Sequence, residues 1–192
     1  GIDNLKLIKS KMEAEGIGQD SQTATYLGRA IKEADHDSIF ARALKRSRRT
    51  ILGYFFQFDA SNIAHLNQSQ MKQYLSNIRN SKYSAIKKSP GVTLKDIYLP
   101  RALAVESNID QLSSAARGGA FFSMVPDIDG AIRRYPLIVQ YRDLVEVPGE
   151  QDYLFAPIAV RTLERFIRGT TIFWIYPGGV DKVAISGRKK II

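Results

Sequence analysis

The sequence predicts an α/β fold: a mixed β-sheet with a central β-hairpin at about residues 120–141, covered by helices in a layered α/β sandwich. Three observations support this prediction. The apolar runs 50–56 and 171–176 are rich in β-branched and aromatic residues, as buried strands are. Segments with apolar residues at helical spacing lie between these runs. The segment 120–141 has two β-rich halves around a turn.

The predicted hairpin combines the run 120–125, a turn, and the run 132–141. The turn is Pro-Asp-Ile-Asp-Gly at 126–130, in which proline presets φ, the aspartates bond nearby backbone N–H groups and glycine takes a positive φ. Arg133 and Arg134 follow, and on a strand they would point to opposite faces. An arginine on the covered face needs a partner, for which Asp127 or Asp129 is near enough in sequence.

The first third of the chain has three amphipathic helical patterns. They begin near Asp3, near Ser21 or Thr23, and at Asp37. Three helices in succession need a support, and we expect a sheet that includes 50–56. That run is apolar on both faces, which predicts a central strand, and Gly53 within it predicts close packing by another element.

The rest of the chain continues the alternation. We expect a loop at 57–69, a helix at 69–78, a mobile polar excursion at 79–91, a short strand at 102–105 and a helix from Asn108 to Ala116. After the hairpin, Pro157 suits the first turn of a helix that reaches Arg168. Strands are predicted at 171–176 and 180–186.

Composition limits the possible chemistry. A chain of 192 residues suits one domain, and it contains no cysteine, which excludes disulfides, thiolate nucleophiles and cysteine-ligated metals. The two histidines, His36 and His65, have no metal-ligand spacing, and the sequence has neither a Gly-x-Ser-x-Gly elbow nor a P-loop. Residues 127–130 resemble the opening of a calcium loop but lack its later acidic ligands. We therefore expect no enzyme activity, cofactor or metal.

The net charge of +9 raises the question of nucleic acid. Basic clusters occur at 45–49, 87–88, 133–134 and 188–190, separated along the chain, and the first lies where a helix ends. Phosphate binding favours basic residues on one face with aromatics or helix N-termini between them. We therefore expect no nucleic-acid partner and a solvated basic surface near anionic lipid headgroups, with a basic nucleic-acid-binding module as the alternative.

The segment 121–137, with the pattern Phe-Phe-x-x-x-Pro-Asp-x-Asp-Gly-x-x-Arg-Arg-x-Pro-Leu, resembles the signature of the second CHASE family. These are extracytoplasmic sensory domains of bacterial adenylate/guanylate cyclases and histidine kinases. Residues 37–44 with 51–56 resemble that family's helix and the buried strand it leads into, and 156–163 resemble its helix after the hairpin. The resemblance covers about 37–165.

The resemblance implies a single sensor domain over 1–192, on the periplasmic or extracellular side of the inner membrane. It also implies transmembrane helices outside the chain, and further strands before Gly1 and after Ile192. The signal would be a small molecule or a protein, with a homodimer as a possible form. Candidate ligand-binding residues are Asp127, Asp129, Arg133, Arg134 and Tyr135. The competing interpretation of these residues is an Asp–Arg pair that locks the turn, and the competing function is a dimerisation domain that senses nothing.

Overall fold

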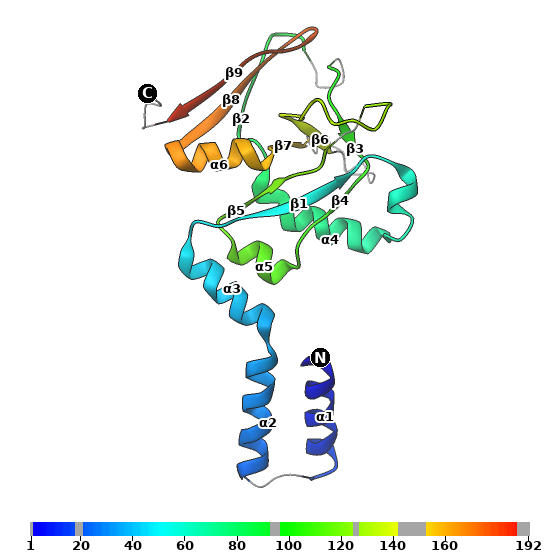
Figure 1. Ribbon diagram of the computed structural model, residues 1–192, viewed down its shortest axis with the longest axis vertical. Coiled ribbons are helices and arrows are strands. Elements are labelled where there is room, and N and C mark those ends of the chain that lie inside the picture. The colour runs from blue at the N-terminus through cyan, green and yellow to red at the C-terminus, as the bar shows by residue number, and fades with distance from the viewer. Residues whose placement is uncertain (1, 18–20, 93–96, 125–126, 142–152, 188–192) are drawn as a thin grey trace.

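The computed structural model describes residues 2–17, 21–92, 97–124, 127–141 and 153–187. Within these ranges the chain forms six α-helices and three three-stranded sheets (Figure 1). The predicted mixed α/β class is therefore confirmed. None of the described helices combines the length and the apolar character needed to cross a bilayer.

The first sheet has the order β4-β1-β5. Its middle strand is β1 (Ile51–Gln57), which pairs antiparallel with β4 (Ala104–Glu106) and parallel with β5 (Gly118–Phe121). The predicted central strand is confirmed, and so is the close packing at Gly53, where an added Cβ would lie 2.6 Å from the Phe122 ring. Only one face of β1 is well covered, however, because Phe55 stays 47% exposed.

The predicted central hairpin is wrong. Residues 118–121 pair with β1, whereas β6 (Val139–Tyr141) pairs parallel with β3 (Arg101–Ala102) and antiparallel with β7 (Tyr153–Phe155) in a different sheet. The free edge of β5 is also used, since the Phe121 N–H donates to the Ala156 carbonyl at 3.2 Å. Pro136 has no N–H for a ladder, so residues 132–137 form no strand.

The third sheet has the order β2-β8-β9. The long strands β8 (Gly169–Tyr176) and β9 (Gly179–Gly187) are antiparallel, which confirms both strands predicted near the C-terminus. The short strand β2 (Ala85–Lys88) pairs parallel with β8. The expected mobile excursion at 79–91 is therefore wrong for 85–88, because a neighbouring strand satisfies their backbone groups.

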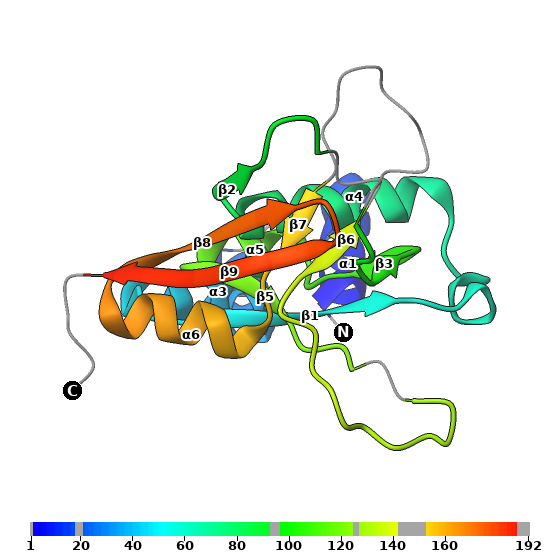
Figure 2. The ribbon, with the colours of Figure 1, turned by 90° about the horizontal axis from the view of Figure 1, so that it is seen from above.

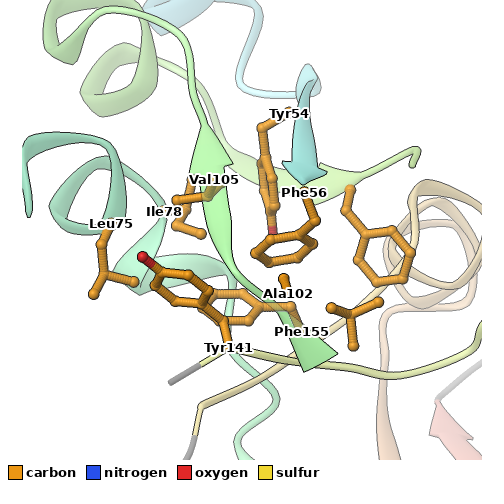
Figure 3. Close-up of a cluster of buried hydrophobic side chains, with 10 residues drawn as sticks. Tyr54, Phe56, Leu75, Ile78, Ala102, Val105, Tyr141 and Phe155 are labelled. Carbon is orange, nitrogen blue, oxygen red and sulfur yellow. The ribbon is translucent and has the colours of Figure 1, made fainter. Parts of the chain in front are cut away.

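Two apolar cores hold these layers together. The larger core is aromatic-rich and lies between the first sheet, α4 (Gln68–Ile78) and the strands β3, β6 and β7 (Figure 3). Its buried members are Tyr54, Phe56, Leu75, Ile78, Ala102, Val105, Phe121, Val139, Tyr141 and Phe155. The smaller core joins the β8 side chains Phe173 and Ile175 to Tyr83, Ile138 and Leu154. Helix α6 (Ile158–Ile167) contacts both β8 and the first sheet (Figures 1 and 2).

Helices α1 (Ile2–Ala14) and α2 (Ser21–Ala34) project away from the sheets side by side, and we call them the stalk (Figure 1). No described side chain of α1 is buried. Only α3 (His36–Ser47) reaches the body, where Ala41 and Leu44 are buried and the helix packs on α5 (Asp110–Ala115). The expectation that all three N-terminal helices lie on a sheet is therefore wrong for α1 and α2.

Candidate functional site

The acidic turn forms with the geometry that its residues predict. The Gly130 N–H donates to the Asp127 carbonyl at 2.8 Å, and Gly130 has φ +79°. The Arg133 guanidinium lies 3.1 Å from Asp127 Oδ2 and 2.7 Å from Asp129 Oδ2. These bonds to Arg133 are the main reason why the pKa of Asp129 lies below its ordinary value. The predicted Asp–Arg pairing is therefore confirmed, on an exposed loop.

The other two residues of the predicted ligand set point elsewhere. Arg134 is exposed and contacts neither aspartate. Tyr135 is half-buried, donates its hydroxyl to the Phe121 carbonyl at 3.3 Å and packs against the larger core. Asp127, Asp129 and Arg133 thus pair with one another, and Tyr135 packs against the core. None of these five residues lines the groove between α3 and α5 that is described next.

A groove of about 410 Å³ lies between α3 and α5. Its volume falls in the range of roughly 300–1,000 Å³ that small-molecule sites occupy. Five of its seven lining residues are polar or basic, and none of the seven is a carboxylate. The lining residues are Ser38, Ala41, Arg42, Lys45, Gln111, Ser114 and Ala115.

The groove exists because α3 and α5 lead into neighbouring parallel strands. Residue Ile51 of β1 pairs with Gly118 of β5, so the two preceding helices run side by side toward the same edge of the sheet. Ala41 and Leu44 fill the contact between the helices. The residues Ser38, Arg42 and Lys45 recur at i, i+4 and i+7, which places them along one side of α3 facing the groove.

A hydrogen-bond relay connects the groove to the stalk. Gln111 Nε2 of α5 donates to Ser38 Oγ at 2.7 Å, and Ser38 Oγ donates to Asp35 Oδ2 at 2.6 Å. Asp35 is the one residue between α2 and α3, and its other oxygen caps α3 by accepting from the Ser38 N–H at 3.1 Å. The relay therefore ends at Asp35, the residue that joins the stalk to α3, and we call this position the hinge.

The electrostatics of the hinge follow from these bonds. The pKa of the Asp35 carboxyl lies below its ordinary value of 3.8, chiefly because the Ser38 hydroxyl and N–H donate to it. The positive charges of Lys6 in α1 and Arg42 in α3 lower this pKa further. Asp35 is therefore a carboxylate at neutral pH, and charges from both the stalk and the groove lining act on it.

The polar groups of the groove include two cations and an amide. Arg42 and Lys45 are cations, and the Gln111 amide has a second N–H beyond the one that bonds Ser38. The Ser38 and Ser114 hydroxyl protons are already donated, to Asp35 and to the Asp110 carbonyl. A carboxylate or phosphate group on a small ligand matches this set. The groove lining offers no paired acid and base and no activated nucleophile, the groups that a catalytic site needs.

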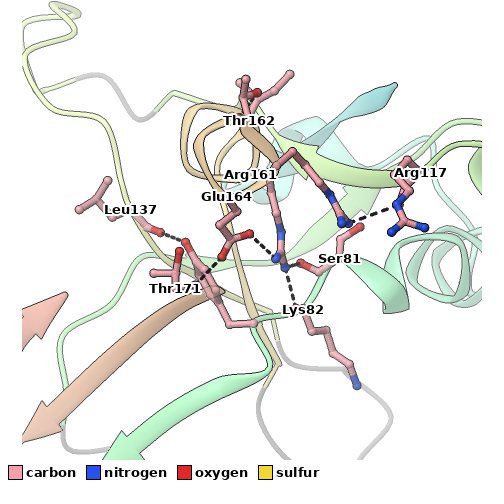
Figure 4. Close-up of polar contacts among 11 residues, drawn as sticks. Ser81, Lys82, Arg117, Leu137, Arg161, Thr162, Glu164 and Thr171 are labelled. Atoms are coloured by element: carbon pink, nitrogen blue, oxygen red, sulfur yellow. Dashed lines mark hydrogen bonds and ion pairs between the residues drawn. The ribbon is translucent and has the colours of Figure 1, made fainter. Parts of the chain in front are cut away.

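A second polar cluster, around α6, is structural (Figure 4). Arg161 and Glu164 form a mostly buried ion pair at 2.7 Å, with side chains 15% and 6% exposed. Arg161 also donates to the Ser81 and Lys82 carbonyls, and Glu164 accepts from the Thr171 N–H at 2.8 Å. These bonds join α6 to residues 81–82 and to β8, so the pair braces α6 against its neighbours.

Sequence reasoning missed the groove. The segment 45–49 was interpreted as cations that balance a helix end, and Asn108–Ala116 as a plain helix. The spacing of Ser38, Arg42 and Lys45 was a usable signal, because a polar stripe beside the buried positions Ala41 and Leu44 marks the border of a helix contact. The second wall, from α5, lies some 70 residues away in sequence and only the fold brings it there.

Comparisons with known proteins gave no match among family models, curated proteins or solved structures.

Proposed function

We propose that this chain is the extracytoplasmic signal-receiving domain of a membrane-anchored bacterial protein with an adenylate/guanylate cyclase or histidine kinase output. In this proposal the α3/α5 groove receives the signal. The observation that carries the proposal is the relay from Gln111 through Ser38 to Asp35, which joins the groove to the hinge of the stalk. The resemblance of residues 121–137 to the CHASE signature is a second support.

The proposed mechanism is competition for the relay. A ligand that bonds to Gln111 replaces its bond to Ser38, and a ligand that accepts from the Ser38 hydroxyl replaces the bond from Ser38 to Asp35. The cap of α3 then changes strength, and the stalk changes its angle to the body. A difference in affinity of about 1–3 kcal/mol between two stalk arrangements changes the output roughly 5- to 150-fold.

Site-directed labelling tests the location. Because the chain has no cysteine, Tyr98→Cys in the full-length membrane protein gives this domain a single thiol at a position that is 99% exposed. A membrane-impermeant maleimide should label this thiol in intact cells, with the unsubstituted protein as the control. Labelling that requires permeabilised cells would contradict the proposed location.

The output of the same full-length protein tests the role of the relay. Ser38→Ala and Gln111→Ala each break the relay, and we expect a several-fold change in cyclase or kinase activity. Ser114→Ala is the matched control: Ser114 lines the same groove, but its hydroxyl bonds within its own helix, to the Asp110 carbonyl at 2.8 Å. Equal output from all three variants and the wild type would contradict a sensory role for the groove.

A further inference from the structure

Three helices end at one edge of the first sheet. Helix α3 leads into β1, α5 leads into β5, and the Arg117 N–H donates to the Thr50 carbonyl at 3.1 Å where the two connections meet. The last turn of α6 joins them, because Arg165 Nη2 lies 3.5 Å from the Arg117 carbonyl oxygen. Figure 1 shows the start of β1, the start of β5 and the end of α6 on the same side of the molecule.

The fold gathers basic residues at this edge, and we call them the basic end. They come from the acid-free stretches 38–58, 111–126 and 165–180. All seven side chains are exposed, and none forms an ion pair within the described part of the chain. The members are Lys45, Arg46, Arg48, Arg49, Arg117, Arg165 and Arg168. With a net charge of +9 for the whole chain, this end carries most of the excess. The basic segments thus lie together, although the sequence separates them.

Compensation of helix dipoles does not account for this charge. Each helix C-terminus carries about −0.5 of a charge, so three of them balance roughly two of the seven cations. The sole acidic residue at the end of α6 is Glu164, which is buried and already paired with Arg161. Like charges also affect one another here, since the pKa of Arg165 is lowered by burial and then by Arg117 and Arg161.

Two arginines of the basic end occupy strained positions. Arg48 and Arg168 follow the last turns of α3 and α6, and both have φ +53°. They are the two non-glycine residues with positive φ among those the structure describes. Glycine is the unstrained residue at such a helix end. A cation therefore stands at two places where the backbone favours glycine.

We propose that the basic end docks on an anionic lipid bilayer. Complementary charge is the first argument, since a bilayer surface with acidic headgroups attracts a spread of cations without needing a fitted groove. The second is Phe166, which lies between Arg165 and Arg168 in sequence and is 67% exposed, as aromatic residues at a membrane interface are. This contact does not depend on the sensory role.

Vesicle flotation of the purified chain tests the proposal. We expect binding to phosphatidylcholine vesicles that contain phosphatidylglycerol, no binding to pure phosphatidylcholine, and a steep loss of binding with added salt. The patch variant combines Arg46→Gln, Arg49→Gln and Arg117→Gln. At about fivefold per removed charge, this variant should bind roughly a hundredfold more weakly.

The matched control removes the same charge elsewhere, with Lys11→Gln, Lys72→Gln and Lys88→Gln, all at exposed positions. Urea midpoints verify that both triple variants fold. An equal loss in the control would mean that net charge alone drives binding, and it would overturn the proposal. Equal binding to neutral vesicles would overturn it too. Displacement of the chain from the vesicles by equimolar duplex DNA, with the same dependence on the patch, would assign the surface to nucleic acid.

Discussion

At the scale of single residues, Arg161 and Glu164 form a mostly buried ion pair that is costly to disturb. Their charges lie out of water, and their desolvation is offset by a short ion pair and by three backbone partners. Removal of one partner leaves the other charge buried without compensation. Removal of either partner is therefore predicted to lower the stability of the fold strongly.

We predict that Glu164→Ala lowers the free energy of unfolding by about 3–5 kcal/mol, because Arg161 and the Thr171 N–H both lose their partner. The measurement is a urea denaturation curve. Thr162→Ala on the exposed side of the same helix is the control, and its shift should be far smaller. A loss below about 1 kcal/mol for Glu164→Ala would show that the pair contributes little, as exposed pairs do.

The exposed Arg133 should behave in the opposite way. Water already solvates its charge and those of Asp127 and Asp129, so the ion pairs add little to stability. We predict that Arg133→Ala leaves the urea midpoint within experimental error. A clear drop in the midpoint would mean that the acidic turn is structurally essential, in contrast with its exposed position.

These two clusters show what sequence predicts at this scale. The Arg133 pair was predicted because its partners lie within six residues of it, on one turn. The Arg161 network was not, since the Ser81 and Lys82 carbonyls are about 80 residues away. Contacts between residues close in sequence can be predicted from the sequence, whereas contacts that only the fold brings together cannot.

At the scale of elements, the α2–α3 hinge depends on a carboxylate. The pKa of Asp35 is lower in the folded chain than its ordinary value of 3.8. A depressed pKa means that the carboxylate stabilises the fold above that value, and that this contribution disappears as the pH falls through the folded pKa.

We predict that the stability advantage of the wild type over Asp35→Asn is constant at neutral pH, begins to fall near pH 3.8 and is lost as the pH drops through the lower folded pKa. Asparagine caps helices well but does not titrate in this range, so the variant isolates the charge of Asp35 from that of other aspartates. Urea midpoints over a pH series supply the measurement. A difference that stays the same at all pH values would refute the role of the carboxylate.

The N-terminus of α4 gives a second prediction at this scale. Asn67 Oδ1 accepts from the Gln70 N–H at 2.9 Å, and Gln70 Oε1 accepts from the Asn67 N–H at 3.0 Å, which is a complete capping box. We predict that Asn67→Ala costs about 1 kcal/mol of stability. Thermal unfolding followed by circular dichroism measures this loss, and an unchanged midpoint would contradict the cap.

Elements were predicted well where their own residues decide them, and poorly where pairing decides them. The strands at 51–57 and 169–176 follow from apolar and β-branched content. The predicted hairpin is wrong because residues 118–121 pair with β1 and bond to the Ala156 carbonyl, both of which lie outside the segment. The strand at 85–88 was missed for the same reason, since its polar lysines pair with β8.

At the scale of the whole molecule, the described chain consists of a body with a groove between α3 and α5 and a stalk that one residue, Asp35, joins to the body. Helix α3 lines the groove and is capped by Asp35 at the hinge, so we propose that a change in the groove reaches the stalk through this helix. The sequence predicted neither the groove nor the projecting stalk, because both depend on which helix faces stay uncovered. It did predict the helices that build them.

The most direct test is the distance between stalk and body, measured by pulsed electron resonance between spin labels. Tyr26→Cys on α2 and Lys72→Cys on α4 supply two exposed positions in a chain without other cysteines. Because the relay fixes the hinge, adding Gln111→Ala should broaden or shift the distance distribution, whereas adding Ser114→Ala should not. Identical distributions with and without Gln111 would contradict the coupling between groove and stalk.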